Sequence, residues 1–323
     1  MTVFDFNRSR FYSFFLTTLR DTIILSKQMR GGTMKKTYII GLISIVVVIL
    51  SLGIFMPSDI ILTPLITPSE YLGSKPYVNL LLAGKTLTII VPSSTIMVFL
   101  LGFQVIYLGL SFLKNKNDNA QLWWGIGMLF WGLGTLSAGL SYQGLGYELK
   151  CQGLEYCQFT SFPELVYLFL TAISMGALCV AISLTVLRKE KQKLLKYYGM
   201  GSVLVYTIVL LIGSIISHQF MISYELFTIF FVPMFVLFFV TSVIQYRENN
   251  DELNKTLIIT WILFLIVNGS YYVYYFLGFT ESIYENTGIW FSANDVLHVA
   301  LIGWMLYIQF VLKRKIEYRE VKQ

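Results

Sequence analysis

Apolar residues fill eight long stretches of this chain, and shorter polar segments separate them. Each stretch has about the 20 residues that an α-helix needs to cross a bilayer core of about 30 Å. A helix also pairs its backbone polar groups internally, which a segment without access to water must do. The pattern predicts eight transmembrane helices, near Tyr38–Met56, Pro92–Leu113, Gln121–Tyr142, Pro163–Leu187, Tyr197–Ser217, Ile222–Tyr246, Thr256–Leu277 and Ile289–Leu312.

The composition points to the same class of protein. Of the 323 residues, 56% are hydrophobic and 13% are charged, whereas a soluble domain has about 25% charged residues. This excludes an ordinary soluble enzyme, a disordered chain and a nucleic-acid-binding module. The predicted fold class is all-α: a polytopic membrane helix bundle with one N-terminal anchor (34–56), a seven-helix unit (92–312) and a basic tail (313–323). The lipid bilayer is the expected partner, with no nucleic acid.

The basic residues predict the orientation of this bundle, because lysine and arginine in short loops stay on the cytoplasmic side. If the Lys35 end is inside, sixteen basic residues lie in inner segments and three, Lys75, Lys85 and Lys150, lie in outer ones. We therefore expect a cell-membrane protein whose N and C termini both face the cytoplasm. The net charge of +6 is then explained by topology and contact with anionic lipid.

Two segments lie outside the predicted bundle. Residues 1–33 lack a long apolar run and are interpreted as an appendage, either a cytoplasmic arm or an over-extended reading frame before Met34. The first span is expected to be an uncleaved anchor, with a signal peptide as the alternative. Residues 57–91 contain four prolines and form an outer loop, whose apolar part, Tyr77–Val91, is expected to be a surface helix, with an interfacial helix or a re-entrant piece as alternatives.

The three cysteines divide between a loop and a span. Cys151 and Cys157 flank a short outer loop, where an oxidising exterior permits a disulfide bond between them. Cys179 falls in the fourth span and is expected to be a small buried apolar residue.

Polar residues within the predicted spans gather towards the outer side. A carboxylate costs several kcal/mol in hydrocarbon and persists mainly where it lines a cavity or finds a partner. Nine of the eighteen acidic residues lie at or near the outer surface. The pattern predicts an acidic, outward-facing cavity that binds a lipid headgroup or a small cation, with ligand-binding candidates Ser141, Gln143, Glu164, Glu225, Asn268 and Asn294.

The last span carries the residues best suited to chemistry. Asp295 and His298 are three residues apart, so they can share one helix face. A carboxylate beside an imidazole can orient it and raise its basicity, which makes this pair the catalytic candidate. The alternative is a hydrogen-bonded clamp between helices.

The same helix, Asn294-Asp295-Val296-Leu297-His298 followed by Gly303, Trp304 and Tyr307, resembles the closing helix of the CREST superfamily. These seven-helix membrane hydrolases include alkaline ceramidases and progestin and adiponectin receptors. The resemblance implies a hydrolase of lipid amide or ester bonds and a zinc ion held by three histidines. Only His298 matches that set, since the other two positions are Asn294 and Gln143.

Neutral amides are poor zinc ligands, so we expect no cofactor, with zinc as the alternative if Asp295, Glu164 or Glu225 completes a mixed site. Two functions remain open: a receptor, sensor or transporter that binds a ligand in the outer cavity, and a degenerate CREST-like hydrolase that uses Asp295 and His298.

Overall fold

The computed structural model describes residues 32–73, 75–82, 84–114 and 118–320. The chain divides into two compact units, Met1–Ile54 and Phe55–Gln323. In the first, the described part is helix α2 (Gly32–Ile54), which is 23 residues long and includes the apolar stretch Ile40–Ile54. The predicted appendage lies almost wholly outside the described residues.

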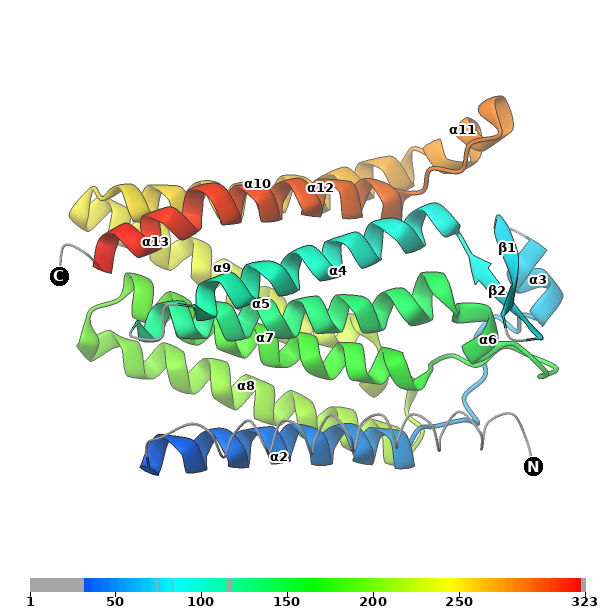
Figure 1. Ribbon diagram of the computed structural model, residues 1–323, viewed down its shortest axis with the longest axis horizontal. Coiled ribbons are helices and arrows are strands. Elements are labelled where there is room, and N and C mark those ends of the chain that lie inside the picture. Colours follow the sequence, from blue (N-terminus) through cyan, green and yellow to red (C-terminus); the bar gives the residue numbers. More distant parts are fainter. Residues whose placement is uncertain (1–31, 74, 83, 115–117, 321–323) are drawn as a thin grey trace. The chain divides into compact units, whose positions relative to one another are not determined.

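The second unit is an all-α bundle of long helices, as the apolar pattern predicted (Figure 1). In the described part of the chain, six helices are long and apolar enough to cross a membrane, which indicates a membrane protein. They are α4 (Pro92–Leu113), α7 (Phe162–Val186), α8 (Lys189–Ile215), α9 (Tyr224–Asn249), α10 (Glu252–Phe276) and the continuous Ala293–Tyr318, which joins α12 (Ala293–Tyr307), the π-helix η3 (Ile308–Leu312) and α13 (Lys313–Glu320).

Two of the eight predicted spans are not among these six. Helix α5 (Asn119–Ala138) is 20 residues long, but four glycines, three tryptophans and Gln121 lower its mean hydropathy. The π-helix η1 (Gly139–Gly144) continues it. The other is α2, whose described apolar stretch is Ile40–Ile54.

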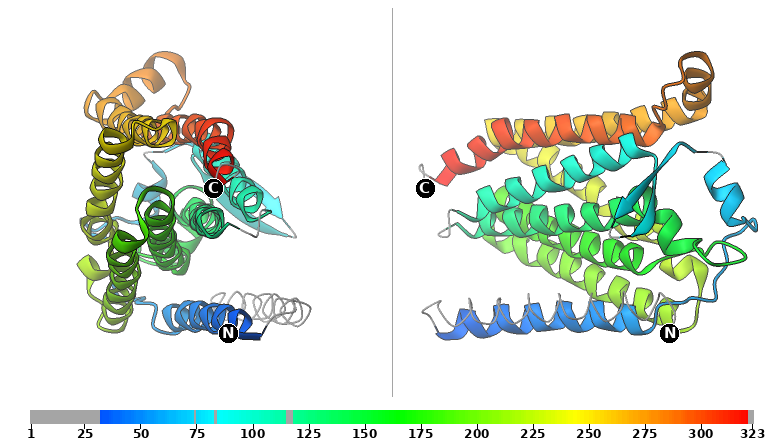
Figure 2. Two further views of the ribbon diagram at one scale, coloured as in Figure 1. Left: turned by 90° about the vertical axis from the view of Figure 1, so that its left-hand side faces the viewer. Right: turned by 45° about the vertical axis from the view of Figure 1, so that its right-hand side comes forward.

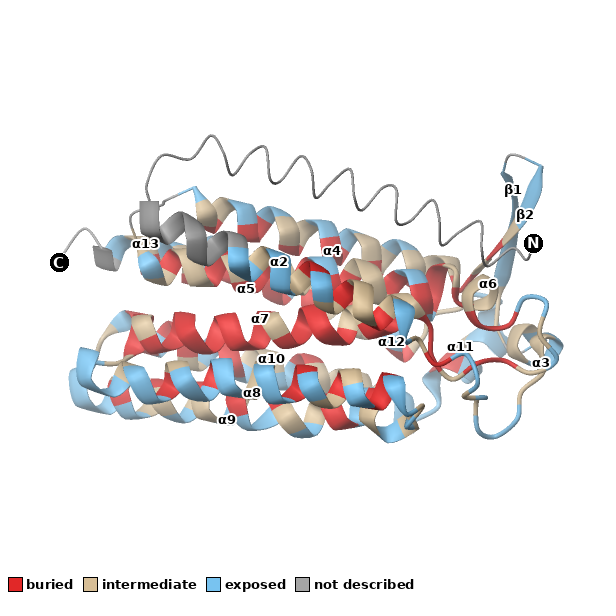
Figure 3. Cartoon of the chain, turned by 90° about the horizontal axis from the view of Figure 1, so that it is seen from below, coloured by how far each residue is buried: buried red, intermediate tan, exposed pale blue. Residues whose placement is uncertain are grey.

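Helix α7 lies at the centre of the second unit. In its most apolar stretch 83% of the residues are buried, compared with 28–39% in the other five candidate spans. Figure 3 shows α7 buried along its length, whereas α8 and α9 present exposed faces. Those exposed faces are apolar, with Leu204, Ile208 and Val236 about half exposed, as expected for helix surfaces that face lipid.

Glycines set the spacing of the helices around α7. Methyl groups at Gly109 of α4 and Gly132 of α5 would lie 2.7 Å from the Leu129 backbone nitrogen and 2.8 Å from the Gly102 carbonyl oxygen. Helices α7 and α8 meet in the same way at Gly176 and Gly199. Small residues let helix backbones approach closely where van der Waals packing drives association, so these glycines fix α4, α5, α7 and α8 side by side (Figure 2).

A small cap covers one end of the bundle. It contains α3 (Pro68–Gly73), the strands β1 (Tyr77–Leu82) and β2 (Lys85–Ile90), and α6 (Gly146–Lys150). We call this the outer end, following the predicted orientation. The helix expected over Tyr77–Val91 is not formed: β1 and β2 pair antiparallel, with Leu82 opposite Lys85. Thr and Ile residues in β2 favour a strand, and Gly84, at φ 77°, permits the tight turn.

The loop that carries two of the cysteines belongs to the same cap. A disulfide joins Cys151 to Cys157. The Leu62 backbone N–H donates to the Cys157 carbonyl (2.9 Å), and the Cys157 N–H donates to the Ile66 carbonyl (2.9 Å). The disulfide loop and residues 60–66 therefore hold each other over the outer end. Cys179 is a free, buried thiol in α7.

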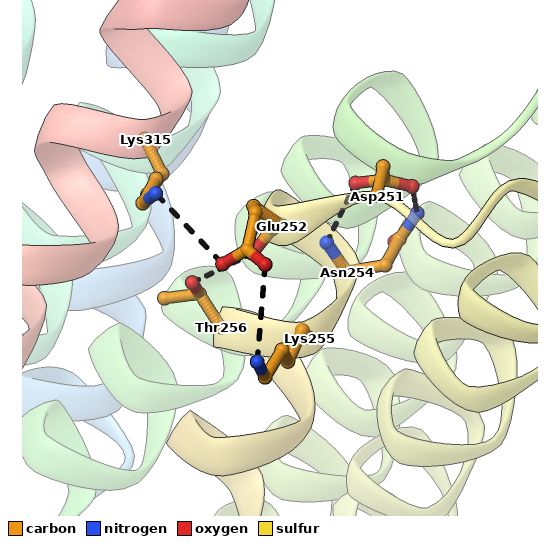
Figure 4. A network of polar contacts seen from close by, with 6 residues as sticks. All are labelled: Asp251, Glu252, Asn254, Lys255, Thr256 and Lys315. Atoms are coloured by element: carbon orange, nitrogen blue, oxygen red, sulfur yellow. Dashed lines mark hydrogen bonds and ion pairs between the residues drawn. The ribbon is translucent and has the colours of Figure 1, made fainter.

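At the opposite end, α13 lies against the start of α10 (Figure 4). Glu252 is 3.8 Å from the Lys255 ammonium and 4.0 Å from that of Lys315. Asp251 caps α10 by accepting from the Asn254 backbone N–H at 2.9 Å. Glu252 and Lys255 are exposed and Lys315 is partly exposed, so this network positions the tail and adds little stability.

Candidate functional site

Two buried carboxylates occupy matching positions at the outer ends of α7 and α12. Glu164 and Asp295 are each the third residue of a helix that begins after a serine, and each closes a capping box with that serine. The carboxylate accepts a hydrogen bond from the serine backbone N–H, at 3.2 Å for Ser161 and 2.6 Å for Ser292. Each therefore satisfies a backbone donor that the start of a helix leaves unpaired.

Glu164 has a positively charged partner. Its carboxylate forms an ion pair with Lys150 of α6, and both side chains are more than 90% buried. The Lys150 ammonium also lies 5.1 Å from the centre of the Tyr142 ring. Ser141 hydrogen-bonds to Ser161 at the base of this group. We call Ser141, Tyr142, Lys150, Ser161 and Glu164 the lysine cluster; its charges balance.

The cap closes over the lysine cluster through Tyr71 of α3. Burial, with the negative charge of Glu164 adding to it, raises the pKa of Tyr71 to about 12. The Lys75 ammonium lies 4.9 Å from the Tyr71 ring centre, and burial, followed by repulsion from Lys150, lowers its pKa. Glu70, on the exposed side of α3, has a pKa lowered by hydrogen bonds from the Thr67 backbone N–H and hydroxyl.

Asp295 lies in a different environment. Its side chain is fully buried. One carboxylate oxygen accepts from the Ser94 hydroxyl of α4 at 2.8 Å, and the other accepts from the Ser292 hydroxyl at 2.8 Å and from the Ser292 N–H. Among the described residues no lysine or arginine pairs with it. The group of Ser94, Ser292, Asp295 and His298, which we call the aspartate cluster, thus holds a buried carboxylate without a cationic partner.

His298 completes the aspartate cluster one helical turn along α12. It is 8% exposed, and its Nδ1 atom is buried without a hydrogen-bond partner. The donors to Asp295 are serines rather than the imidazole. A buried polar atom without a hydrogen-bond partner is uncommon and needs an explanation. A ligand that binds next to His298 would be one such explanation.

The other predicted site residues lie in different settings. Glu225 and Asn294 are exposed, and Glu225 is close enough to Tyr142 of the lysine cluster to interact with it electrostatically. Asn268 donates to the Phe264 carbonyl of its own helix at 2.8 Å. Gln143 is buried in η1, and its Oε1 atom has no partner. Among the predicted site residues, Ser141 and Glu164 thus belong to the lysine cluster and Asp295 and His298 to the aspartate cluster, and the single shared cavity stays a prediction.

Several residues of these clusters were missed in the sequence, namely Tyr71, Ser94, Lys150, Ser161 and Ser292. Two of them carry a readable signal, because Ser161-x-x-Glu164 and Ser292-x-x-Asp295 match the spacing of a capping box. Lys150 and Tyr71 come from the cap, and no local pattern links them to α7. Ser94 is 201 residues from Asp295, a contact that only the packing of α4 against α12 creates.

A metal site needs several His, Cys, Asp or Glu side chains close together. Among the described residues, no group of three or more His, Cys, Asp and Glu side chains is arranged to hold a metal ion.

No protein-family model matches this chain, and neither a curated protein nor a solved structure matches it. The function of this chain is therefore inferred from the two clusters alone.

Proposed function

We propose that this protein binds a positively charged ligand at the aspartate cluster, as a receptor, sensor or transporter of the cell membrane. The ligand is a small cation or the ammonium group of a lipid headgroup. The main support for the proposal is the fully buried Asp295 carboxylate. It accepts hydrogen bonds from hydroxyl and backbone amide groups, but no lysine or arginine of the described structure forms an ion pair with it. Burying an unpaired charge is costly, and a bound cation offsets that cost.

The contrast with Glu164 supports this proposal. Both carboxylates cap a helix, but Lys150 already neutralises Glu164. Exposed carboxylates on the outer side would raise the local concentration of cations; they are Asp59, Glu155, Glu281 and Glu285. In this proposal α2 and α5 also span the membrane, which gives eight spans and places both termini in the cytoplasm.

A hydrolase of the CREST type is the competing proposal. It would need Asp295 to orient His298 and a group to supply or activate the nucleophile. The Asp295 oxygens accept hydrogen bonds from Ser94 and Ser292 rather than from His298. Ser141, a hydroxyl that could serve as the nucleophile, is hydrogen-bonded to Ser161 in the lysine cluster. These contacts favour binding over hydrolysis.

A thermal-shift experiment tests the proposal. Purified protein is heated with sodium, potassium, choline or ethanolamine chloride at constant ionic strength. We expect at least one cation to raise the Tm of the native protein and of Glu225→Gln, an exposed control, and not that of Asp295→Asn. Asn keeps an acceptor oxygen for the helix cap, and a monodisperse elution profile verifies its fold.

Two results would overturn the proposal: no cation stabilises the native protein, or Asp295→Asn keeps the full shift. If Asp295→Asn does not fold, His298→Gln takes its place, and an unchanged shift in that variant counts against the aspartate cluster. Release of product from a ceramide-like substrate that His298→Gln abolishes would favour the hydrolase instead.

A further inference from the structure

A pocket of about 640 Å³ opens between α8 and α9 at the end of the bundle opposite the aspartate cluster. Its walls are mainly apolar and include Leu194, Leu195, Leu237 and Ile244. Ligand pockets typically have volumes of about 300–1,000 Å³, so this one can hold a chain of methylene groups. It lies beside helix faces that are exposed and apolar, with Leu194 80% exposed.

The mouth of this pocket is basic. Lys191 lines it, together with a single acidic residue, Glu190. Arg188 immediately precedes α8, and its carbonyl accepts a hydrogen bond from the Lys191 backbone N–H at 3.0 Å, which holds the two residues close together. Lys189 and Lys193 follow on the same turns, and all four basic residues are exposed. None of the four forms an ion pair in the described structure.

The position of the pocket relative to the predicted membrane matches its basic mouth and apolar walls. It is lined by the first three turns of α8 and the last three of α9, so the basic residues stand at the predicted membrane surface and the leucines below it. An apolar groove with a basic mouth is complementary to one amphiphile, an acyl chain that carries an anionic headgroup. Basic pockets between spans on the cytoplasmic side bind such headgroups.

We propose that this pocket is a binding site for an anionic phospholipid of the cytoplasmic leaflet. One acyl chain fills the groove between α8 and α9, and the phosphate is held by Lys191 and Arg188. Glu190 opposes the headgroup and limits the affinity. The site is independent of the aspartate cluster, and a failure of either proposal leaves the other intact.

Native mass spectrometry of the purified full chain tests this site, with phosphatidylglycerol and phosphatidylcholine of identical acyl chains as probes. We expect the protein to retain one phosphatidylglycerol molecule at concentrations at which phosphatidylcholine is lost. Each basic residue near a membrane surface contributes about fivefold in affinity. Arg188→Gln with Lys191→Gln should therefore weaken phosphatidylglycerol binding about 30-fold and leave phosphatidylcholine binding unchanged.

Two further variants test whether Glu190 opposes the headgroup and whether an acyl chain enters the groove. Glu190→Gln should strengthen phosphatidylglycerol binding about fivefold. Thr241→Trp places an indole in the groove and should weaken both lipids. The matched control is Arg314→Gln with Lys315→Gln, which removes the same charge from α13, on the far side of the unit from α8 (Figure 1), and should leave binding unchanged.

Several outcomes would overturn the proposal. Equal retention of both lipids, or equal loss in the α13 control, would mean that charge attracts lipid without a defined site. Unchanged binding in Thr241→Trp would mean that no chain enters the groove. Displacement of the lipid by millimolar inorganic phosphate would mean that a free anion is the ligand, and a second copy of the chain in place of lipid would mean that the groove is a protein interface.

Discussion

Glu164 and Asp295 are two single residues that occupy the same position in their helices but differ in whether a cation pairs with them. Both are the third residue of a capped helix. Lys150 pairs with the first, and only serines bond to the second. The difference comes from α6, whose lysine reaches α7, and it separates a structural charge from a charge that we propose to be functional.

Removing the partner of Glu164 should be costly. Lys150→Met leaves a buried carboxylate unpaired, and breaking a buried ion pair typically lowers the free energy of unfolding by about 3–5 kcal/mol. Lys150→Met with Glu164→Gln removes both charges and should recover most of that loss. The comparison is Lys255→Met, which breaks an exposed pair and should cost less than about 1 kcal/mol. Equal losses in the two single variants, measured by thermal unfolding, would contradict the burial of Lys150.

Tyr71 makes the outer cap sensitive to alkaline pH. Burial raises its pKa to about 12, above the value of about 10 expected in the unfolded chain. Its contribution to stability is therefore complete below pH 10 and is lost between pH 10 and pH 12. The Tm of Tyr71→Phe should fall less steeply than that of the native protein over this interval. Parallel Tm curves would show that Tyr71 is not buried against Glu164.

At the scale of elements, the sequence predicted the long helices well because their signal is local. Observed helices begin and end within a few residues of the expected spans, with three exceptions. Helix α2 starts at Gly32 rather than Tyr38, α8 starts at Lys189 rather than Tyr197, and the last helix continues to Glu320 rather than ending at Leu312. These extra turns are helical, but they are too polar to be recognised as membrane-spanning. The hairpin was missed because Tyr77–Ile90 is apolar, and apolar content alone does not distinguish a short strand from a helix.

The glycine contacts give a prediction at this scale. Gly109→Ala in α4 would place a methyl group 2.7 Å from the backbone of α5, and overpacking of this kind costs about 1–3 kcal/mol. Gly201→Ala in α8 is the matched control, because nothing lies within 4 Å of its added methyl group. It should stabilise the protein slightly, by up to about 1 kcal/mol, as glycine is a poor helix former. A Gly109→Ala variant with a native or higher Tm would contradict the close packing of α4 on α5.

At the scale of the whole molecule, composition and charge pattern predicted a helical membrane bundle, but they did not predict which polar groups meet. The depth of a residue along a membrane span can be predicted from the sequence. The direction in which its side chain points and the helices it contacts depend on packing, as the hydrogen bond from Ser94 to Asp295 shows. Residues at similar depth therefore fall into the lysine cluster, the aspartate cluster and side chains outside both, such as Asn268, which bonds to its own helix.

The span assignment of α5 can be tested in intact cells. Single cysteines replace Asn119, at the start of α5, and Glu155, in the loop before α7; both positions are exposed. In a Cys179→Ser background, a membrane-impermeant maleimide should label the cysteine at 155 and should label the cysteine at 119 only after the membrane is permeabilised. Labelling of both positions in intact cells would mean that α5 does not cross the membrane.

Infrared spectroscopy can observe the Asp295 carboxylate itself. Infrared difference spectra are recorded on protein in bilayers while the cation that raises the Tm is added and removed. We predict a change in the carboxylate stretching bands that is lost in Asp295→Asn and retained in Glu164→Gln. Spectra without a carboxylate change, or a change that survives in Asp295→Asn, would contradict cation binding at Asp295.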